Sequence, residues 1–349
     1  MKSIRLRCGI SGRPPSLFRL AAGLLVSVFV GGLIVPAACL GVTAQVPEKT
    51  PFTLDGDIVK VGVLAHRGRE LCVDQWKPHM LFLTGNVNGY QFEMIPLGFD
   101  EVEPAVRRKE VDFLLTNPAQ HAYLDADHGL CAVATLKESG GDAPTPLFSG
   151  VFIAKRGFAP DGDLSHLKGA RLAFVHPLSF GGYFAGLCEL KKSGFDMSRD
   201  VAGVLFAGTH DGVVEMVLRG DADVGLVRAN TVERMAQEER LDPAKLMFVG
   251  LKNNSPEYSM AHSTDVYPNW PFSALAHVPA DLRWSVSQAL LGMMDDDPAV
   301  IAASAGGWSY PLSYASVREC LRYLGVDPFR GEADSGWRVA IKRYWRWIV

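Results

Sequence analysis

Short apolar segments alternate with helix-like segments along most of this 349-residue chain, and this alternation limits the possible folds most strongly. Strands are predicted over residues 58–64, 91–96, 111–116 and 132–136. Helices are predicted between them, over residues 71–83 and 102–109. Strands that alternate with helices form a largely parallel sheet whose faces the helices cover. The sequence therefore predicts an α/β fold.

A second set of strands and helices follows a Gly- and Pro-rich loop at 139–146. It has predicted strands at 171–175, 204–207 and 222–227, and helices at 182–192 and 211–219. Segments 247–250 and 272–276 are predicted strands that return to the first set, ahead of helices at 279–295 and 314–324. This order predicts two α/β lobes with a hinge and an interlobe cleft. Lobe 1 would comprise residues 57–160 and 262–330, and lobe 2 residues 161–261.

The N-terminal segment has the features of an export signal. Five basic residues precede a charge-free run over 20–42, and Ala44 ends a small-residue cleavage site. Residues 1–44 are therefore predicted to be a signal peptide of a periplasmic protein, with an uncleaved membrane anchor as the alternative. Cleavage would leave a net charge of −8, since the segment holds five of the 35 basic residues and no acidic one. That balance argues against nucleic acid as a partner.

The cysteines and histidines do not indicate a metal or a cofactor. Cys72, Cys131, Cys188 and Cys320 remain after cleavage, and they form no C-x-x-C pair. Export would permit a disulfide, but the spacing does not select a pair. His66, His121, His176 and His210 fall at different strand ends without a metal-ligand spacing. We expect no metal site, no cofactor and no catalytic residues.

A Gly-rich turn joins a predicted strand to a helix within residues 171–190. His176 and Ser179 precede Gly181, Gly182 and Tyr183 there. Backbone N–H groups at a helix start lack intrahelical partners, and the helix dipole attracts negative charge to them. The turn can therefore bind an anion without a metal or a lysine. It can equally be a simple helix cap.

Polar residues also follow other strands, where ligands of open α/β sheets bind. Asn117, Gln120 and Tyr123 follow the strand at 111–116, His210 follows the one at 204–207, and Arg228 ends the one at 222–227. An arginine can hold an oxyanion through two hydrogen bonds, and a structural ion pair is the alternative. A protonated His176 or His210 would also hold an anion, and affinity would then fall as the pH rises past roughly 6.5.

Several motifs resemble those of known binding proteins. TNPAQHAYL, DLSHLKGARLAFVHPLSFGGY and RGDADVGLVRANTVERM resemble periplasmic solute-binding proteins of the phosphate/phosphite/phosphonate type. More narrowly, VRANTVERM, RLDPAKLMFVG, HSTDVYPNWPFSAL and WSYPLSYASVRECL are similar to periplasmic sensor domains of tetrathionate-responsive histidine kinases. The resemblance covers residues 58 to 329. It implies a type II periplasmic-binding-protein fold whose lobes close on a small solute.

The resemblance also implies which residues bind the ligand. In the first lobe they are Asn117, Gln120 and Tyr123, and in the second lobe Ser179, Gly181, Gly182, Tyr183 and Arg228. Ser179 stands alone where phosphonate binders have more hydroxyls, which argues against phosphonate itself. Asn230 and Met260-Ala261 stand where sensor members carry cysteines, which argues against a thiol role in sensing.

Three functions stay open at this point. The main prediction is a binding protein that captures a small solute, an oxyanion by preference, and presents it to the membrane permease of an ABC-type transporter. The alternative is the ligand-sensing component of a two-component system, with a sensor histidine kinase as partner. An exported enzyme on the same fold is a minor alternative. The aromatic and basic tail at 331–349 fits either peripheral membrane contact or a terminal helix packed on the domain.

Overall fold

The computed structural model describes residues 56–159 and 161–329. All of them belong to one compact unit, Thr53–Val349. The predicted export signal at 1–44 and the tail at 331–349 lie outside the described residues. No helix within the described ranges is both long and apolar enough to cross a membrane.

The described residues form thirteen strands and nine α-helices, with three short helical turns. The strands are β1 (Asp57–Leu64), β2 (Tyr90–Leu97), β3 (Phe113–Leu115), β4 (Cys131–Glu138), β5 (Leu147–Phe148), β6 (Gly150–Lys155), β7 (Arg171–Phe174), β8 (Gly203–Phe206), β9 (Val224–Arg228), β10 (Leu246–Val249), β11 (Tyr267–Pro268), β12 (Pro271–Ala274) and β13 (Ala305–Ser309). The helices are α1 (Arg69–Asn86), α2 (Val102–Arg107), α3 (Pro118–His128), α4 (Ala185–Lys192), α5 (His210–Arg219), α6 (Thr231–Gln237), α7 (Ala280–Leu291), α8 (Pro298–Ala302) and α9 (Ala315–Leu324), with the turns η1 (Leu164–Leu167), η2 (Phe180–Phe184) and η3 (Pro243–Lys245).

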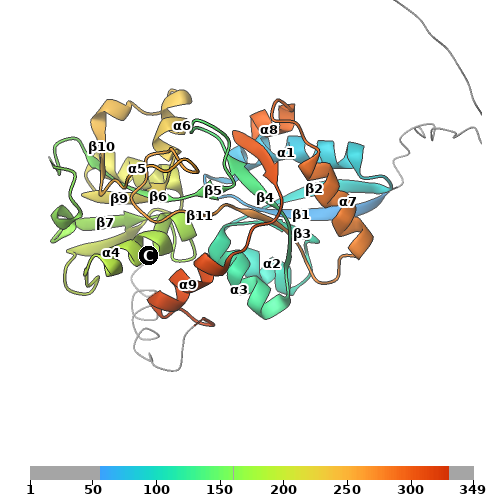
Figure 1. Cartoon of the computed structure of the whole chain (residues 1–349), viewed down its shortest axis with the longest axis horizontal. Helices are drawn as coiled ribbons and strands as arrows, with labels where there is room; N and C mark the ends of the chain where they lie inside the picture. Colours follow the sequence, from blue (N-terminus) through green and yellow to red (C-terminus); the bar gives the residue numbers. More distant parts are fainter. Residues whose placement is uncertain (1–55, 160, 330–349) are drawn as a thin grey trace, which may run out of the picture. The chain divides into compact units, whose positions relative to one another are not determined.

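Two sheets form two lobes, as the alternation predicts (Figure 1). The first sheet has the order β13-β4-β12-β3-β1-β2, with β2, β1 and β3 parallel. The second has the order β10-β6-β9-β7-β8, with β8, β7 and β9 parallel. Helices cover both faces of such sheets, so central strands are buried and largely apolar. Every residue of β3 and of β9 is accordingly buried.

The chain crosses between the two sheets along β5 and returns along β11. These two short strands pair antiparallel, with Tyr267 opposite Phe148, and they form the hinge. The two crossings confirm the predicted pair of α/β lobes joined by a hinge. The first crossing comes before β6, which pairs with β9 and β10 of the second sheet, so the sheets divide ahead of the expected lobe boundary at residue 160.

One strand pairing differs from the prediction. Segment 247–250 is a strand, but β10 lies in the second sheet with Met247 opposite Ala154, and it does not return to the first set. The early crossing of β6 exposes a sheet edge in the second lobe, and β10 covers this edge with antiparallel hydrogen bonds. By contrast, the segment at 272–276 does return, since β12 lies between β3 and β4.

Three helices begin where their strands meet the opposite lobe, and each start has a polar cap. Asn117 accepts hydrogen bonds from Ala119 and Gln120 at the start of α3. Ser179 caps η2, which leads into α4, and Thr209 caps α5 through the N–H of Gly212. Such caps satisfy backbone N–H groups that the first helical turn leaves unpaired. The caps place three helix starts at the interface between the lobes.

Candidate functional site

Asn117 connects the two lobes directly. Its Nδ2 donates to the carbonyl oxygen of Leu178 in the second lobe at 3.2 Å and to Gln120 Oε1 at 2.9 Å. Gln120 Nε2 donates in turn to the carbonyl oxygen of Phe99 at 2.8 Å. The predicted amides therefore lie at the interface, where the protein's own groups hold them in place.

The turn after β7 lies opposite Asn117. Ser179 Oγ accepts a hydrogen bond from the N–H of Gly182 at 3.1 Å, so its hydroxyl acts as a helix cap. A Cβ on Gly181 would lie 2.8 Å from the Phe148 ring, and one on Gly182 would lie 2.3 Å from the Val175 side chain. Both glycines are thus required for close packing at the hinge.

Two predicted aromatic residues point away from the polar interface. The Tyr183 ring packs inside the second lobe against Phe174 and Phe206, with centroid separations of 5.1 and 5.3 Å. Burial raises the pKa of Tyr183 to about 12. The Tyr123 ring lies 5.6 Å from that of Phe329, and its pKa is likewise raised by burial. The structure gives both tyrosines packing roles.

His176 and His210 lie at the interface, but they are not positively charged near neutral pH. Burial, together with the nearby charge of Arg228, lowers the pKa of His210 to about 3. Its Nδ1 accepts the backbone N–H of Arg228 at 3.1 Å. Burial also lowers the pKa of His176 despite Asp100 at 3.3 Å, whose charge opposes that shift. Without a ligand both rings are therefore largely neutral near pH 7, and the assistance of a protonated histidine in anion binding stays a prediction.

Arg228 lies at the centre of the interface. It forms an ion pair with Glu138, from the end of β4 in the first lobe, and donates to Asn269 Oδ1 at 2.8 Å. Its guanidinium carbon lies 5.3 Å from the Phe148 ring and 5.5 Å from the Trp270 ring. Two aromatic faces therefore help to retain a charge that is almost fully withdrawn from water.

A second arginine shares the carboxylate of Glu138. Arg234, on α6, donates to Glu138 Oε1 at 2.6 Å, whereas Arg228 bonds to Oε2. We call these three residues the Glu138 cluster. It carries two positive charges and one negative charge, and the Nε atoms of both arginines are buried without a hydrogen-bond partner among the described residues. The cluster can therefore accept one more negatively charged group.

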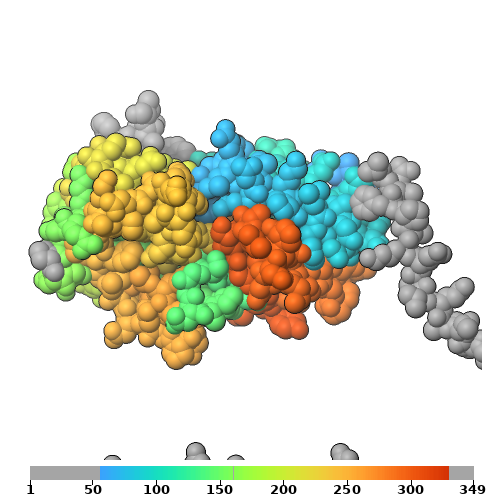
Figure 2. Space-filling view, turned by 90° about the horizontal axis from the view of Figure 1, so that it is seen from above, coloured from blue at the N-terminus to red at the C-terminus, as the bar shows by residue number. Residues whose placement is uncertain are grey.

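A second charged cluster joins the lobes at Arg67, the residue after His66. Arg67, which follows β1, forms paired hydrogen bonds of 2.7 to 3.0 Å to both Asp211 and Glu238 of the second lobe. Arg240 also pairs with both carboxylates. These four residues form the Arg67 cluster, whose two positive and two negative charges balance. In the space-filling view the segment after β1 adjoins the segment around α6 (Figure 2).

The sequence interpretation did not identify Glu138, Arg234 or Asn269. Glu138 ends a strand whose predicted range stopped at residue 136, two residues short of it. Arg234 lies within the motif VRANTVERM, six residues after Arg228. A single turn of α6 brings it back to the strand end. Two signals were thus present in the sequence. One was a carboxylate at the end of a strand, and the other was a second arginine in the first turn of the helix that follows Arg228.

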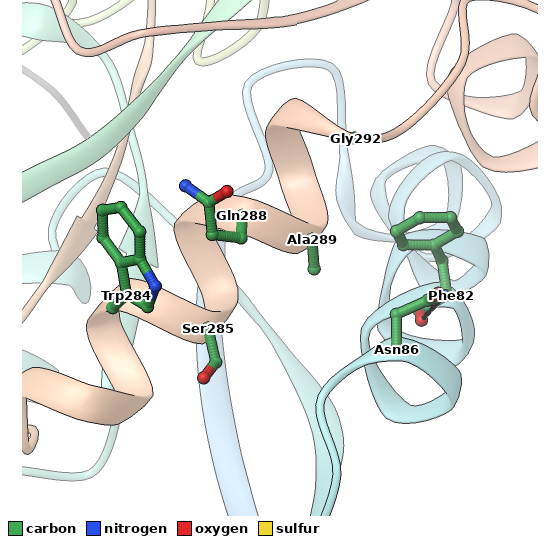
Figure 3. A pocket seen from close by; sticks show the side chains of 7 residues that line it. All are labelled: Phe82, Asn86, Trp284, Ser285, Gln288, Ala289 and Gly292. Carbon is green, nitrogen blue, oxygen red and sulfur yellow. Dashed lines mark hydrogen bonds between the residues drawn. The ribbon is translucent and has the colours of Figure 1, made fainter. Parts of the chain in front are cut away.

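An open pocket of about 400 Å³ lies elsewhere, between α1 and α7 of the first lobe. Phe82 and Asn86 line it from α1, and Trp284, Ser285 and Gln288 line it from α7 (Figure 3). None of the ten predicted ligand residues lies in this lining. The interface around Arg228, which collects most of them, is therefore the candidate site.

Two lobes that meet over a buried polar cluster define the class of two-lobed solute-binding proteins. The chain belongs to the family described as the periplasmic substrate-binding protein of phosphonate ABC transporters, whose model matches residues 61–317. The members of this family are binding proteins of the periplasm that take small-molecule ligands. The family and the fold predicted from the sequence motifs are thus confirmed.

Relatives and solved structures agree with this family. The chain is 28% identical over 271 residues to the tetrathionate sensor histidine kinase TtrS of Salmonella typhimurium, a match that covers 77% of this chain and 44% of the kinase. It thus spans less than half of that relative's length. PhnD1 of Prochlorococcus marinus, solved with methylphosphonate, is 15% identical with a TM-score of 0.64, and 77% of this chain and 98% of that chain are covered. A binding protein component of an ABC phosphonate transporter from Pseudomonas aeruginosa is 13% identical with a TM-score of 0.62, and the coverage is 83% and 94%. At these identities the two structures establish the two-lobed fold.

Proposed function

We propose that the protein binds a small oxyanion between its lobes, beside Arg228 and Arg234, and presents it to an ABC-type permease. The observation that carries this proposal is the excess positive charge of the Glu138 cluster, together with its two unpartnered guanidinium N–H groups. Charge-assisted hydrogen bonds from arginine are strong in such a buried setting. An oxyanion there would contact both lobes at once and would favour the closed arrangement.

The ligand contacts that we propose come from both lobes. Arg228 and Arg234 would supply charge from the second lobe, while Asn117, with Gln120 behind it, and the helix start at Ser179 would supply neutral donors. His176 and His210 would line the site as neutral rings. Gly181, Gly182, Tyr183 and Tyr123 would shape the site through packing.

A thermal-shift screen of the purified protein tests this proposal. The panel comprises phosphate, phosphite, methylphosphonate, sulfate, thiosulfate and tetrathionate, with a neutral sugar and a polyamine for comparison. A tight ligand raises the melting temperature by mass action. We expect an anion to do so, and Arg228→Ala to weaken its binding at least about 30-fold, as truncation of a buried charged partner does.

The matched control is Arg199→Ala, because Arg199 is an exposed arginine whose ion pair lies within the second lobe. It should leave the anion shift unchanged. Stabilisation by the sugar or the polyamine alone would refute the oxyanion proposal. Recovery of the anion unchanged after prolonged incubation, followed by ion chromatography, would support binding without turnover, whereas conversion would indicate an enzyme.

Ligand sensing is the second candidate, because the sequence is similar to a sensor kinase over 271 residues. Deletion of the gene separates the two roles. Loss of uptake of the radiolabelled anion, with anion-induced transcription unchanged, would indicate transport. Loss of the transcriptional response, with uptake unchanged, would indicate a sensor that acts through a membrane histidine kinase.

A further inference from the structure

Two of the four cysteines in the described ranges meet between α4 and α9. The Cys188 thiol lies 3.9 Å from the carbonyl oxygen of Cys320, and the Cys320 thiol lies 3.7 Å from the carbonyl oxygen of Phe184. Phe184 ends η2, directly before α4, and lies four residues before Cys188. Each sulfur therefore lies against the backbone of the opposite helix, in the same narrow gap.

The two thiols also affect each other's ionisation. A hydrogen bond between them is the largest cause of both shifts: it lowers the pKa of Cys188 and raises the pKa of Cys320. The nearby charge of Lys192 lowers the pKa of Cys188 as well. Cys188 is thus the group that ionises first, and the thiolate is the form that attacks the disulfide of an oxidant in thiol–disulfide exchange.

The other two cysteines have different surroundings. Cys72 donates to the carbonyl oxygen of Val63 inside the first lobe, and burial raises its pKa to about 12. Cys131 lies exposed at the start of β4. Neither contacts another thiol among the described residues, so the geometry selects one of the six pairs that these four cysteines could form.

We propose that Cys188 and Cys320 form a disulfide in the exported protein and that it fastens α9 to α4 of the second lobe. Both thiols lose their protons, and one S–S bond forms. The two electrons reduce the disulfide of an external dithiol–disulfide oxidant to two thiols. Both cysteines are buried in the folded protein, so the bond would form before folding is complete.

The position of α9 gives this bond a mechanical consequence. α9 contacts α4, and it also packs on α3 of the first lobe, where Arg318 lies 3.7 Å from Asp125. One hydrophobic cluster contains Ala119 and Ala122 of α3, Cys188 of α4, and Val317 and Leu321 of α9. With α9 bonded to α4, it would move with the second lobe, and opening of the lobes would have to separate α9 from α3.

Mass spectrometry tests the pairing. The full chain is purified from the exported compartment without reductant, denatured, alkylated with iodoacetamide and digested. We expect Cys72 and Cys131 to be alkylated and the Cys188 and Cys320 peptides to be linked, with reduction separating them. Alkylation of all four cysteines, or linkage of Cys188 to any other cysteine, Cys8 and Cys39 included, would overturn the proposal.

Variants extend the test to the consequence of the bond. Reduction should lower the melting temperature of the protein by roughly 5–10 °C, the size expected for a disulfide that closes a long loop. Cys188→Ser should abolish this difference and leave Cys320 open to alkylation, whereas Cys131→Ser should preserve both the linkage and the shift. If Cys188→Ser does not fold, the peptide map of the unaltered chain still decides the pairing. Equal melting temperatures with and without reductant, in a protein whose peptides are linked, would refute the fastening role.

Discussion

The two charged clusters at the lobe interface are built from the same groups but differ in their balance. In the Arg67 cluster, Arg67 bonds both carboxylates in pairs, and two positive charges meet two negative ones. In the Glu138 cluster, two arginines share one carboxylate, and two buried N–H groups have no hydrogen-bond partner within residues 56–159 and 161–329. The positive charges of the first cluster are fully balanced by its own carboxylates, whereas the second cluster keeps one unbalanced positive charge.

We expect this difference to give the two clusters separate roles, the Arg67 cluster in lobe closure and the Glu138 cluster in ligand binding. The balanced Arg67 cluster needs no ligand to bridge the lobes, so we expect it to set how often the closed arrangement is populated. On the proposed function, the Glu138 cluster would gain a further partner only when an anion enters, and it would then set which ligand the closed arrangement accepts. An anion that contacts both arginines would take up their free donors while Glu138 keeps part of their charge compensated.

The largest effect should follow from Glu138→Gln, which removes the one carboxylate of its cluster. Two buried guanidinium groups would lose their counter-charge, and breaking a buried pair costs about 3–5 kcal/mol. Urea denaturation should therefore show a large loss of stability, partly restored by the anion that gives the strongest thermal shift. Asp211→Asn is the matched control, since Glu238 still pairs with Arg67, and its loss should be clearly smaller. Equal losses would remove the distinction between the clusters.

A smaller effect is expected from Arg67→Met, which retains the apolar stem but removes the charge that bridges the lobes. Fewer molecules would then be closed, and the apparent anion affinity should fall about 10-fold, equivalent to about 1.4 kcal/mol. Small-angle scattering should show a larger radius of gyration without ligand. Arg199→Met, within the second lobe, serves as the control. An unchanged radius and affinity would show that the Arg67 cluster does not govern closure.

The sequence predicted one side of this comparison better than the other for a physical reason. Arg228 and Asn117 stand directly at the ends of apolar strands, and a strand end is a local pattern. The partner of Arg228 is 90 residues away in the sequence. β4 and β9 lie in different sheets, and only the contact between the two lobes brings their ends together, which no local sequence pattern encodes.

The direction in which a side chain points could not be predicted from the local sequence either. The family resemblance placed Tyr183, just after the Gly-rich turn, among the ligand contacts. Tyr183 lies within the π-helical turn η2, which takes an additional residue per hydrogen-bonded turn and so changes the side-chain directions of a regular helix start. Its ring packs on Phe174 within the second lobe. The pairing of β10 was missed for the same kind of reason, since its strand pattern does not identify its neighbour.

Mild acid should reduce stability through His210, whose Nδ1 accepts the backbone N–H of Arg228, before it affects the Arg67 cluster. The pKa of His210 lies at about 3 in the folded protein because of burial, against about 6.5 for an unfolded histidine, so between these values the unfolded chain binds the extra proton. Stability should therefore fall as the pH drops below about 6.5. Hydrogen bonds from Arg67 are the main cause of the lowered pKa of Glu238. Burial acts to raise the pKa of Asp211, but the hydrogen bonds and charges of Arg67 and Arg240 together outweigh burial and lower that pKa. The Arg67 cluster thus loses stability only below about pH 4, where the unfolded carboxyls titrate.

The measurement is the difference between the unaltered chain and His210→Asn, whose amide oxygen can accept the Arg228 N–H in place of Nδ1. Between pH 6 and 5 the unaltered chain should lose about 1 kcal/mol more than the variant in urea denaturation. Other buried histidines, such as His79, titrate in both proteins and cancel. Parallel stability profiles would show that His210 is not a source of the acid sensitivity.

The smallest effect should come from the contact between Asp100 and His176, which also joins the lobes. Asp100 Oδ2 and His176 Nε2 are 3.3 Å apart, but burial keeps the His176 ring largely neutral near pH 7 and the Asp100 side chain is 62% exposed, so the attraction between them is weak. His176 is held independently by its stacking on Phe99, with ring centroids 4.6 Å apart. Asp100→Asn should therefore change stability by at most about 0.5 kcal/mol and leave the anion affinity unaltered. A loss comparable to that of Arg67→Met would mean that proximity alone, and not burial and charge balance, determines which interface contacts control closure.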